Sequence, residues 1–89
     1  MIDEQDKKII LDLARKYEVS KVFLFGSSLL QNQTARDIDL AIEGIADIDF
    51  FPFYGDLICA LSRPVDVVDL KRVSKFTDMI KRDGVRLDA

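Results

Sequence analysis

Residues 37–42 read Asp-Ile-Asp-Leu-Ala-Ile, and this stretch decides how the rest of the chain is interpreted. Successive side chains of a β-strand point to opposite faces, so this stretch has an apolar face and an acidic face. The apolar face carries Ile38, Leu40 and Ile42, and the other face carries Asp37, Asp39 and Ala41. Two like charges on one face repel each other, so we expect that face to be open to water or to bind a divalent cation such as Mg²⁺.

A second strand is predicted upstream, over residues 21–25, where the chain reads Lys-Val-Phe-Leu-Phe. It ends at Gly26, which permits a tight turn and a close approach of the backbone to a ligand. Ser27 follows as the expected N-cap of a short helix. Free N–H groups at a helix N-terminus bind anions, so Gly26 and Ser27 are candidates for holding a triphosphate.

A third strand is predicted over residues 65–70, and it contains two further carboxylates. Asp66 lies between apolar neighbours, where a charge is costly unless it faces water, a metal or a partner. Asp69 is three residues away, so it points to the opposite face, near the end of the strand. We therefore take Asp66 as the third carboxylate. Three carboxylates on one open sheet face are typical of two-metal phosphoryl or nucleotidyl transfer.

Helical spacing of apolar residues predicts a helix over about residues 4–17, with Asp3 as its N-cap. Asp47 or Asp49 is the expected N-cap of another helix, which has Pro52 in its first turn and is ended by Arg63-Pro64. A last helix runs from Ser74 to Gly84, after which Val85 and Leu87 pack back onto the core. The order is α-β-α-β-α-β-α. We expect one α/β (α+β) domain over residues 1–89, with a small three-stranded mixed sheet and helices mainly on one face.

Composition excludes several kinds of site. The 89 residues include no histidine and one cysteine, which excludes Ser-His-Asp triads, His-ligated metals and an internal disulfide. Cys59 lies in an apolar helical stretch and is predicted to be a buried structural thiol. The net charge of −3 does not favour strong nucleic-acid binding. The acidic N-terminus and the short apolar stretches predict a cytoplasmic protein that does not enter membranes.

Together, residues 22–27, 37–42 and 65–70 resemble the minimal nucleotidyltransferase (MNT) family of the polymerase-β-like nucleotidyltransferase superfamily. The resemblance implies that Gly26 and Ser27 hold the nucleotide's phosphates and that Asp37 and Asp39 bind two Mg²⁺ ions. Asp66 would complete the metal site and activate the acceptor hydroxyl. Such enzymes transfer a nucleoside monophosphate from ATP or a similar triphosphate. Small members pair with a helical HEPN partner as a toxin–antitoxin system, in which the resemblance implies AMP transfer to a partner tyrosine.

The sequence departs from the family pattern just after Gly26-Ser27. Family members often carry arginines there, whereas residues 28–30 of this chain read Ser-Leu-Leu. Arg36 either replaces that phosphate-neutralising charge or caps the loop. A catalytically weak binding module of the same fold therefore stays an alternative. A phosphatase built on Asp-x-Asp is disfavoured, because the residues before Asp37 are polar and such an enzyme needs an apolar strand there. An EF-hand is disfavoured because the sequence lacks the alternating oxygen ligands of its calcium loop. The aromatic residues at 50, 51, 53 and 54 fit either core packing or a surface for a partner or a second copy.

Overall fold

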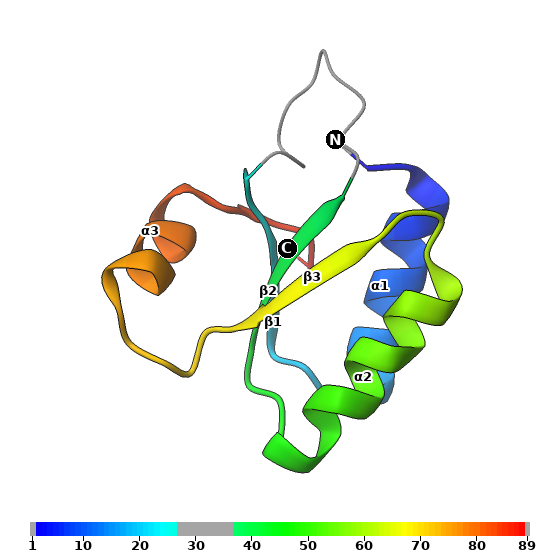
Figure 1. Ribbon diagram of the computed structural model, residues 1–89, viewed down its shortest axis with the longest axis horizontal. Helices are drawn as coiled ribbons and strands as arrows, with labels where there is room; N and C mark the ends of the chain where they lie inside the picture. The colour runs from blue at the N-terminus through cyan, green and yellow to red at the C-terminus, as the bar shows by residue number, and fades with distance from the viewer. Residues whose placement is uncertain (1, 27–36, 89) are drawn as a thin grey trace.

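The computed structural model describes residues 2–26 and 37–88. Within them the chain forms three helices and four strands (Figure 1). In chain order they are α1 (Glu4–Lys16), β1 (Lys21–Leu24), β2 (Ile38–Glu43), α2 (Asp47–Ala60), β3 (Val65–Asp69), α3 (Lys75–Asp83) and β4 (Val85–Arg86). The short helix predicted at Ser27 lies outside the described residues.

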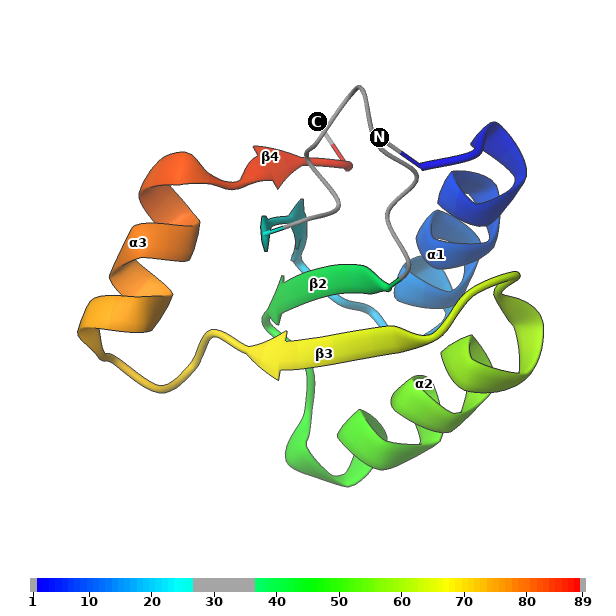
Figure 2. The ribbon, with the colours of Figure 1, turned by 45° about the horizontal axis from the view of Figure 1, so that its top comes forward.

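The strands form one mixed sheet in the order β3-β2-β1-β4 (Figure 2). β1 is antiparallel to both β2 and β4. β2 and β3 are parallel, because α2, which connects them, returns the chain to the end of the sheet at which β2 begins. The three predicted strands are confirmed, and β4 is additional. Val85 lies opposite Leu24, and Arg86 lies opposite Phe23. Two residues are too short to show a strand period, so β4 exists only through its pairing with β1.

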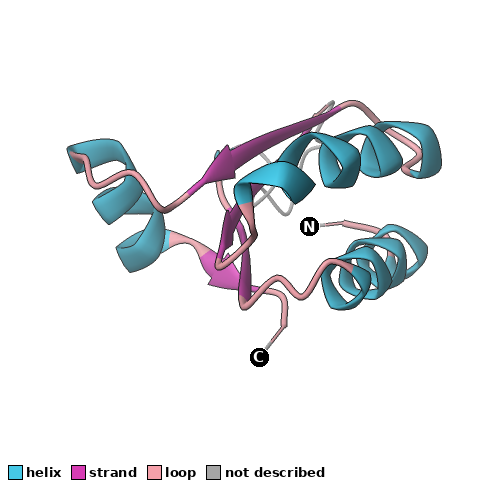
Figure 3. Cartoon of the chain, turned by 90° about the horizontal axis from the view of Figure 1, so that it is seen from below, coloured by secondary structure: helices cyan, strands magenta, loops and turns pink. Residues whose placement is uncertain are grey.

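Helices cover both faces of the sheet unequally. α1 and α2 lie on one side and α3 lies on the other (Figures 1 and 3). The main core between the sheet and α1 and α2 contains Ile38, Leu40 and Ile42, all fully buried. A smaller cluster on the α3 side contains Phe23, Ala41, Leu70 and Ile80. The predicted alternation of residues 38–42 is therefore confirmed, and the acidic face of that stretch is the α3 side of the sheet.

The ends of the helices are fixed in different ways. Asp3 occupies the N-cap of α1 but its side chain makes no capping hydrogen bond. Ser74 caps α3 as predicted, in a capping box whose other member is Thr77. Gly84 is the C-cap, but its φ of −69° is not left-handed. A Cβ there would lie 2.6 Å from the Ile80 carbonyl oxygen, so glycine is needed for close packing rather than for its backbone angle.

Three predictions about α2 are wrong, those on its N-cap, on the turn that holds Pro52 and on the burial of Cys59. Its N-cap is Ala46, neither Asp47 nor Asp49, so Pro52 lies in the second turn instead of the first. Pro52 has no N–H to donate to the carbonyl oxygen of Ile48, so one hydrogen bond of the helix is missing. Because Ile48 is exposed, its carbonyl oxygen can accept a hydrogen bond from water instead. Cys59 is exposed rather than buried, because the buried side of α2 is set by Phe53 and Leu57. No helix in the described part of the chain is long and apolar enough to span a membrane.

Candidate active site

Asp39 of β2 and Asp66 of β3 are register partners in the sheet. Neighbouring strands lie about 4.8 Å apart, and partner residues of parallel strands present their side chains on the same face. Here that face is the α3 side, since Ala41, one alternation further along β2, belongs to the core cluster there, and Val68, one alternation further along β3, packs against it. Asp66 is exposed and Asp39 is half-buried. Two carboxylates predicted from separate strands are thus adjacent.

The turn after β1 lies against the same carboxylate. The Phe25 amide donates a hydrogen bond to the Asp39 carbonyl oxygen, at 3.1 Å, which continues the pairing of β1 with β2. Gly26 then adopts a left-handed φ of 63°. A Cβ at Gly26 would lie 2.7 Å from Oδ2 of Asp39. The glycine predicted to approach a ligand therefore also leaves room for the Asp39 carboxylate.

The remaining predicted residues are placed less completely. Asp37 is exposed in the bend that precedes β2, two residues before Asp39. Ser27 and Arg36 lie outside the described residues. Asp69 is the partner of Ile42, toward the other end of the parallel pair, and its Oδ1 accepts a hydrogen bond from the Lys71 amide. Of the two carboxylates on β3, Asp66 is therefore the one beside Asp39.

The donor set suits a hard cation, because carboxylate oxygens are the ligands that Mg²⁺ takes in proteins, together with water and substrate phosphates. However, no group of three or more acidic, cysteine or histidine side chains in residues 2–26 and 37–88 is close enough together to hold a metal ion. The described structure thus brings Asp39 and Asp66 into register and leaves Asp37 nearby. Asp39 and Asp66 could hold Mg²⁺ alongside a nucleotide that supplies further oxygens.

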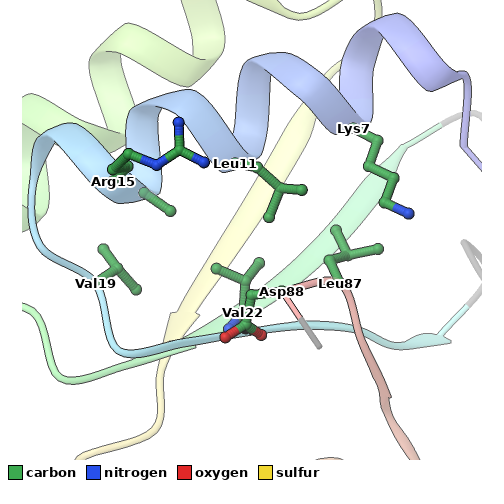
Figure 4. Close-up of a pocket in the computed structure, with 8 residues that line it drawn as sticks. Lys7, Leu11, Arg15, Val19, Val22, Leu87 and Asp88 are labelled. Atoms are coloured by element: carbon green, nitrogen blue, oxygen red, sulfur yellow. Dashed lines mark hydrogen bonds between the residues drawn. The ribbon is translucent and has the colours of Figure 1, made fainter.

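A cavity of about 480 Å³ lies away from these carboxylates, between α1, the start of β1 and the residues after β4 (Figure 4). Val22 and Leu87, which line it, belong to the core on the α1 and α2 side, so the sheet separates this cavity from Asp39 and Asp66. Asp88 at its edge accepts two hydrogen bonds from Arg86, and the pKa of Asp88 is about 2 chiefly because of that guanidinium. This cavity is not part of the candidate site.

The aromatic residues of α2 separate into core and surface. Phe53 is fully buried and packs edge-to-face on Tyr17, whereas Phe51 is 78% exposed. Phe50 and Tyr54 are half-buried and pack against the main core. Core packing thus accounts for three of the four rings, and Phe51 belongs to the surface.

Sequence reasoning did not single out two aromatic residues near the carboxylates. Phe25 adjoins Asp39 across the sheet and packs edge-to-face on Phe76 of α3, with ring centroids 5.8 Å apart. The alternation of residues 23–25 carried a signal for Phe25, because Phe23 and Phe25 must share one strand face. Nothing local connected Phe76 to that face, since only the packing of α3 brings the two rings together.

Comparison with known proteins relates this arrangement to a family. The family model described as polymerase beta, nucleotidyltransferase, matches residues 7–87. No curated protein matches the chain. Among solved structures, a toxin–antitoxin with AMP-PNP is 27% identical, with a TM-score of 0.73, and the match covers 91% of this chain and 71% of that one.

Two further structures are similar. A Shewanella oneidensis complex of a tri-AMPylated HEPN toxin with an MNT antitoxin is 26% identical (TM-score 0.69; 92% of this chain, 68% of that one). The toxin–antitoxin MntA-HpeT, in a form with two aspartates changed to glutamate, is 25% identical (TM-score 0.72; 91% and 70%). The family and fold predicted from the sequence are confirmed. The chain belongs to the polymerase β nucleotidyltransferase family, and its structural neighbours are minimal nucleotidyltransferases of toxin–antitoxin systems.

Proposed function

We propose that this protein is a Mg²⁺-dependent nucleotidyltransferase that transfers AMP from ATP to a hydroxyl group of a helical HEPN-type partner protein, as the antitoxin of a toxin–antitoxin pair. The observation that carries the proposal is the alignment of Asp39 with Asp66 on one face of the sheet, with Gly26 against Asp39. Family membership supports the reaction class. Similar structures with AMP-PNP and with an AMPylated HEPN toxin support the nucleotide and the partner.

Each residue has a proposed role. Asp37, Asp39 and Asp66 hold two Mg²⁺ ions, which would stabilise the negative charge of the phosphates when bound. Gly26, Ser27 and Arg36 hold and neutralise the triphosphate, although Ser27 and Arg36 lie outside the described residues. Because Asp66 is exposed beside Asp39, it is also placed to accept a proton from an incoming hydroxyl.

The proposed reaction is a single displacement at phosphorus. The acceptor oxygen bonds to the α-phosphorus of ATP, and its proton passes to the carboxylate of Asp66. The bond from that phosphorus to the bridging oxygen breaks, and pyrophosphate leaves with the bonding electrons. The product is an AMP ester of the acceptor. We expect this reaction to take place in the cytoplasm, where ATP is available.

A second candidate is a binding module that neutralises its partner by contact, with weak or no catalysis. It is favoured because, within residues 2–26 and 37–88, no three acidic, cysteine or histidine side chains lie close enough together to hold a metal ion. The Ser-Leu-Leu of residues 28–30, where relatives often carry arginine, points the same way. In this reading the partner, or a second copy of the chain, binds without receiving AMP.

Transfer of radioactive label from the α-phosphate of ATP separates the two candidates. Wild-type protein is incubated with Mg²⁺ and a lysate of the source organism, alongside the Asp37→Ala/Asp39→Ala double variant. Asp78→Ala, which removes an exposed carboxylate of α3, is the matched control. We expect a labelled protein band with the wild type and with Asp78→Ala, and none with the double variant. Equal background in all three, with a partner that still co-purifies, would support the binding module instead.

A further inference from the structure

We propose that Phe76 and Phe25 form a platform on which the base of the nucleoside triphosphate stacks. The inference rests on the proposed nucleotide-binding function and adds a site for the base. It starts from a row of three side chains across the sheet. Phe25, directly after β1, adjoins Asp39, and Asp39 is the register partner of Asp66. The ring of Phe25 therefore stands on the same face as the two carboxylates, beside Asp39.

Phe76 extends this row away from the sheet. Its ring meets Phe25 edge-to-face, at 80° between planes and 5.8 Å between centroids. One strand spacing of about 4.8 Å separates the Asp39 and Phe25 positions. The sugar of a nucleotide can lie over this step, between the carboxylates that hold its phosphates and the ring of Phe76, beyond Phe25, that stacks on its base.

The ring of Phe76 is both accessible and held in place. Phe76 is 48% exposed, so a face of the ring is open to solvent. Its helix is fixed on either side of it, by the Ser74–Thr77 capping box at the N-terminus and by the fully buried Ile80 one turn later. A pre-positioned ring loses little conformational freedom when a ligand stacks on it, which favours binding.

The chemistry of the pair favours a base over other flat or apolar groups. A nucleobase presents a flat π-face to an aromatic ring, and each base–aromatic stack contributes measurably to affinity. Packing alone explains Phe23 and Ile80, which are buried in one cluster, but it does not explain why Phe76, whose ring contacts the one beside Asp39, stays half exposed.

The test compares a ligand that has a base with one that has only phosphates. Binding of AMP-PNP and of inorganic tripolyphosphate, both with Mg²⁺, is measured by calorimetry on the full chain. We expect Phe76→Ala to weaken AMP-PNP binding about tenfold and to leave tripolyphosphate binding unchanged. Phe76→Tyr, which keeps the ring, should bind AMP-PNP within about twofold of the wild type.

Two controls account for packing. Phe51→Ala removes an exposed ring from α2, on the other side of the sheet, and should change neither affinity. Phe76→Leu keeps an apolar contact with Phe25 but offers no ring, so it should lose AMP-PNP affinity as Phe76→Ala does, even if the alanine variant unfolds.

The outcomes separate this inference from the proposed function. If the wild type binds AMP-PNP and the folded Phe76→Leu variant binds it equally well, the base platform is wrong while the function stands. If Phe76→Leu loses AMP-PNP and tripolyphosphate in equal measure, Phe76 supports the fold of the site and not the base. A wild-type chain that binds neither ligand would overturn the proposed function, and the platform with it.

Discussion

The backbone of Gly26 lies so close to the carboxylate of Asp39 that a Cβ at position 26 would stand 2.7 Å from Oδ2. The contact joins the turn after β1 to the acidic face of β2. It also explains why a left-handed residue without a side chain occurs there, since any other residue would displace the carboxylate or strain the backbone.

Gly26→Ala should therefore harm activity more than stability. The left-handed φ costs an alanine about 1 to 2 kcal/mol of folding free energy. The overlapping atom is the end of a side chain, so the Asp39 carboxylate moves and AMP transfer should be lost. Gly55→Ala is the matched control, because a Cβ there meets nothing within 4 Å and helix α2 should gain about 0.5 to 1 kcal/mol. Urea unfolding and label transfer on both variants measure these effects. Full transfer by Gly26→Ala would contradict the assigned role of the turn.

Asp66→Asn should abolish transfer without destabilising the protein. Asp66 is exposed, so the change should alter the free energy of unfolding by less than about 0.5 kcal/mol. With AMP-PNP and Mg²⁺ at ten times Kd, the wild type should gain about 1.4 kcal/mol. That gain raises Tm by about 6 to 11 °C for a domain of this size. Thermal unfolding with AMP-PNP and Mg²⁺ should show this rise in Tm for the wild type and a smaller rise for the variant. Adding EDTA, which removes the Mg²⁺, should reduce the rise in the wild type. An equal rise in both would mean that Asp66 binds no metal.

Ser62→Ala should destabilise the fold although Ser62 lies on the surface. Its hydroxyl donates a 2.6 Å hydrogen bond to Oδ2 of Asp6, a carboxylate that is only 3% exposed. Removing a donor from a buried acceptor costs about 1 to 3 kcal/mol, so the urea midpoint should fall accordingly. Ser20→Ala, at another exposed serine, should change stability by less than about 0.5 kcal/mol. Equal midpoints for the two variants would show that the Asp6 carboxylate does not need this partner.

Asp88 should make stability fall in acid. The Arg86 guanidinium, helped by the amide of Val22, lowers the pKa of Asp88 from 3.8 to about 2 in the folded protein. A folded-state pKa below the unfolded value stabilises the protein above about pH 4, and this contribution is lost as pH falls toward 2. Asp88→Asn should therefore have a lower Tm than the wild type at pH 6, and the difference should shrink between pH 4 and pH 2. A constant difference would show that the charge of Asp88 plays no part.

Local sequence could predict the features that depend on a residue and its near neighbours. The alternation of residues 38–42 fixed which face of β2 is buried, because strand side chains alternate whatever the partner strand is. Ser74 fixed the start of α3, because an N-cap side chain bonds to an amide only a few residues further on. The alternation also placed Asp39 on a strand, and the apolar neighbours of Asp66 placed it on another.

Long-range packing decided the rest. Nothing in the sequence near Asp6 shows that its carboxylate is buried on α1 and accepts a hydrogen bond from Ser62, far along the chain. The parallel register that sets Asp39 beside Asp66 depends on how α2 returns the chain, and β4 forms only because β1 offers it a free edge. The sequence by itself determined the secondary structure around the carboxylates and their chemistry. Only the tertiary structure decided which carboxylates meet and which aromatic rings stand beside them, because contacts between distant segments leave no period in the sequence.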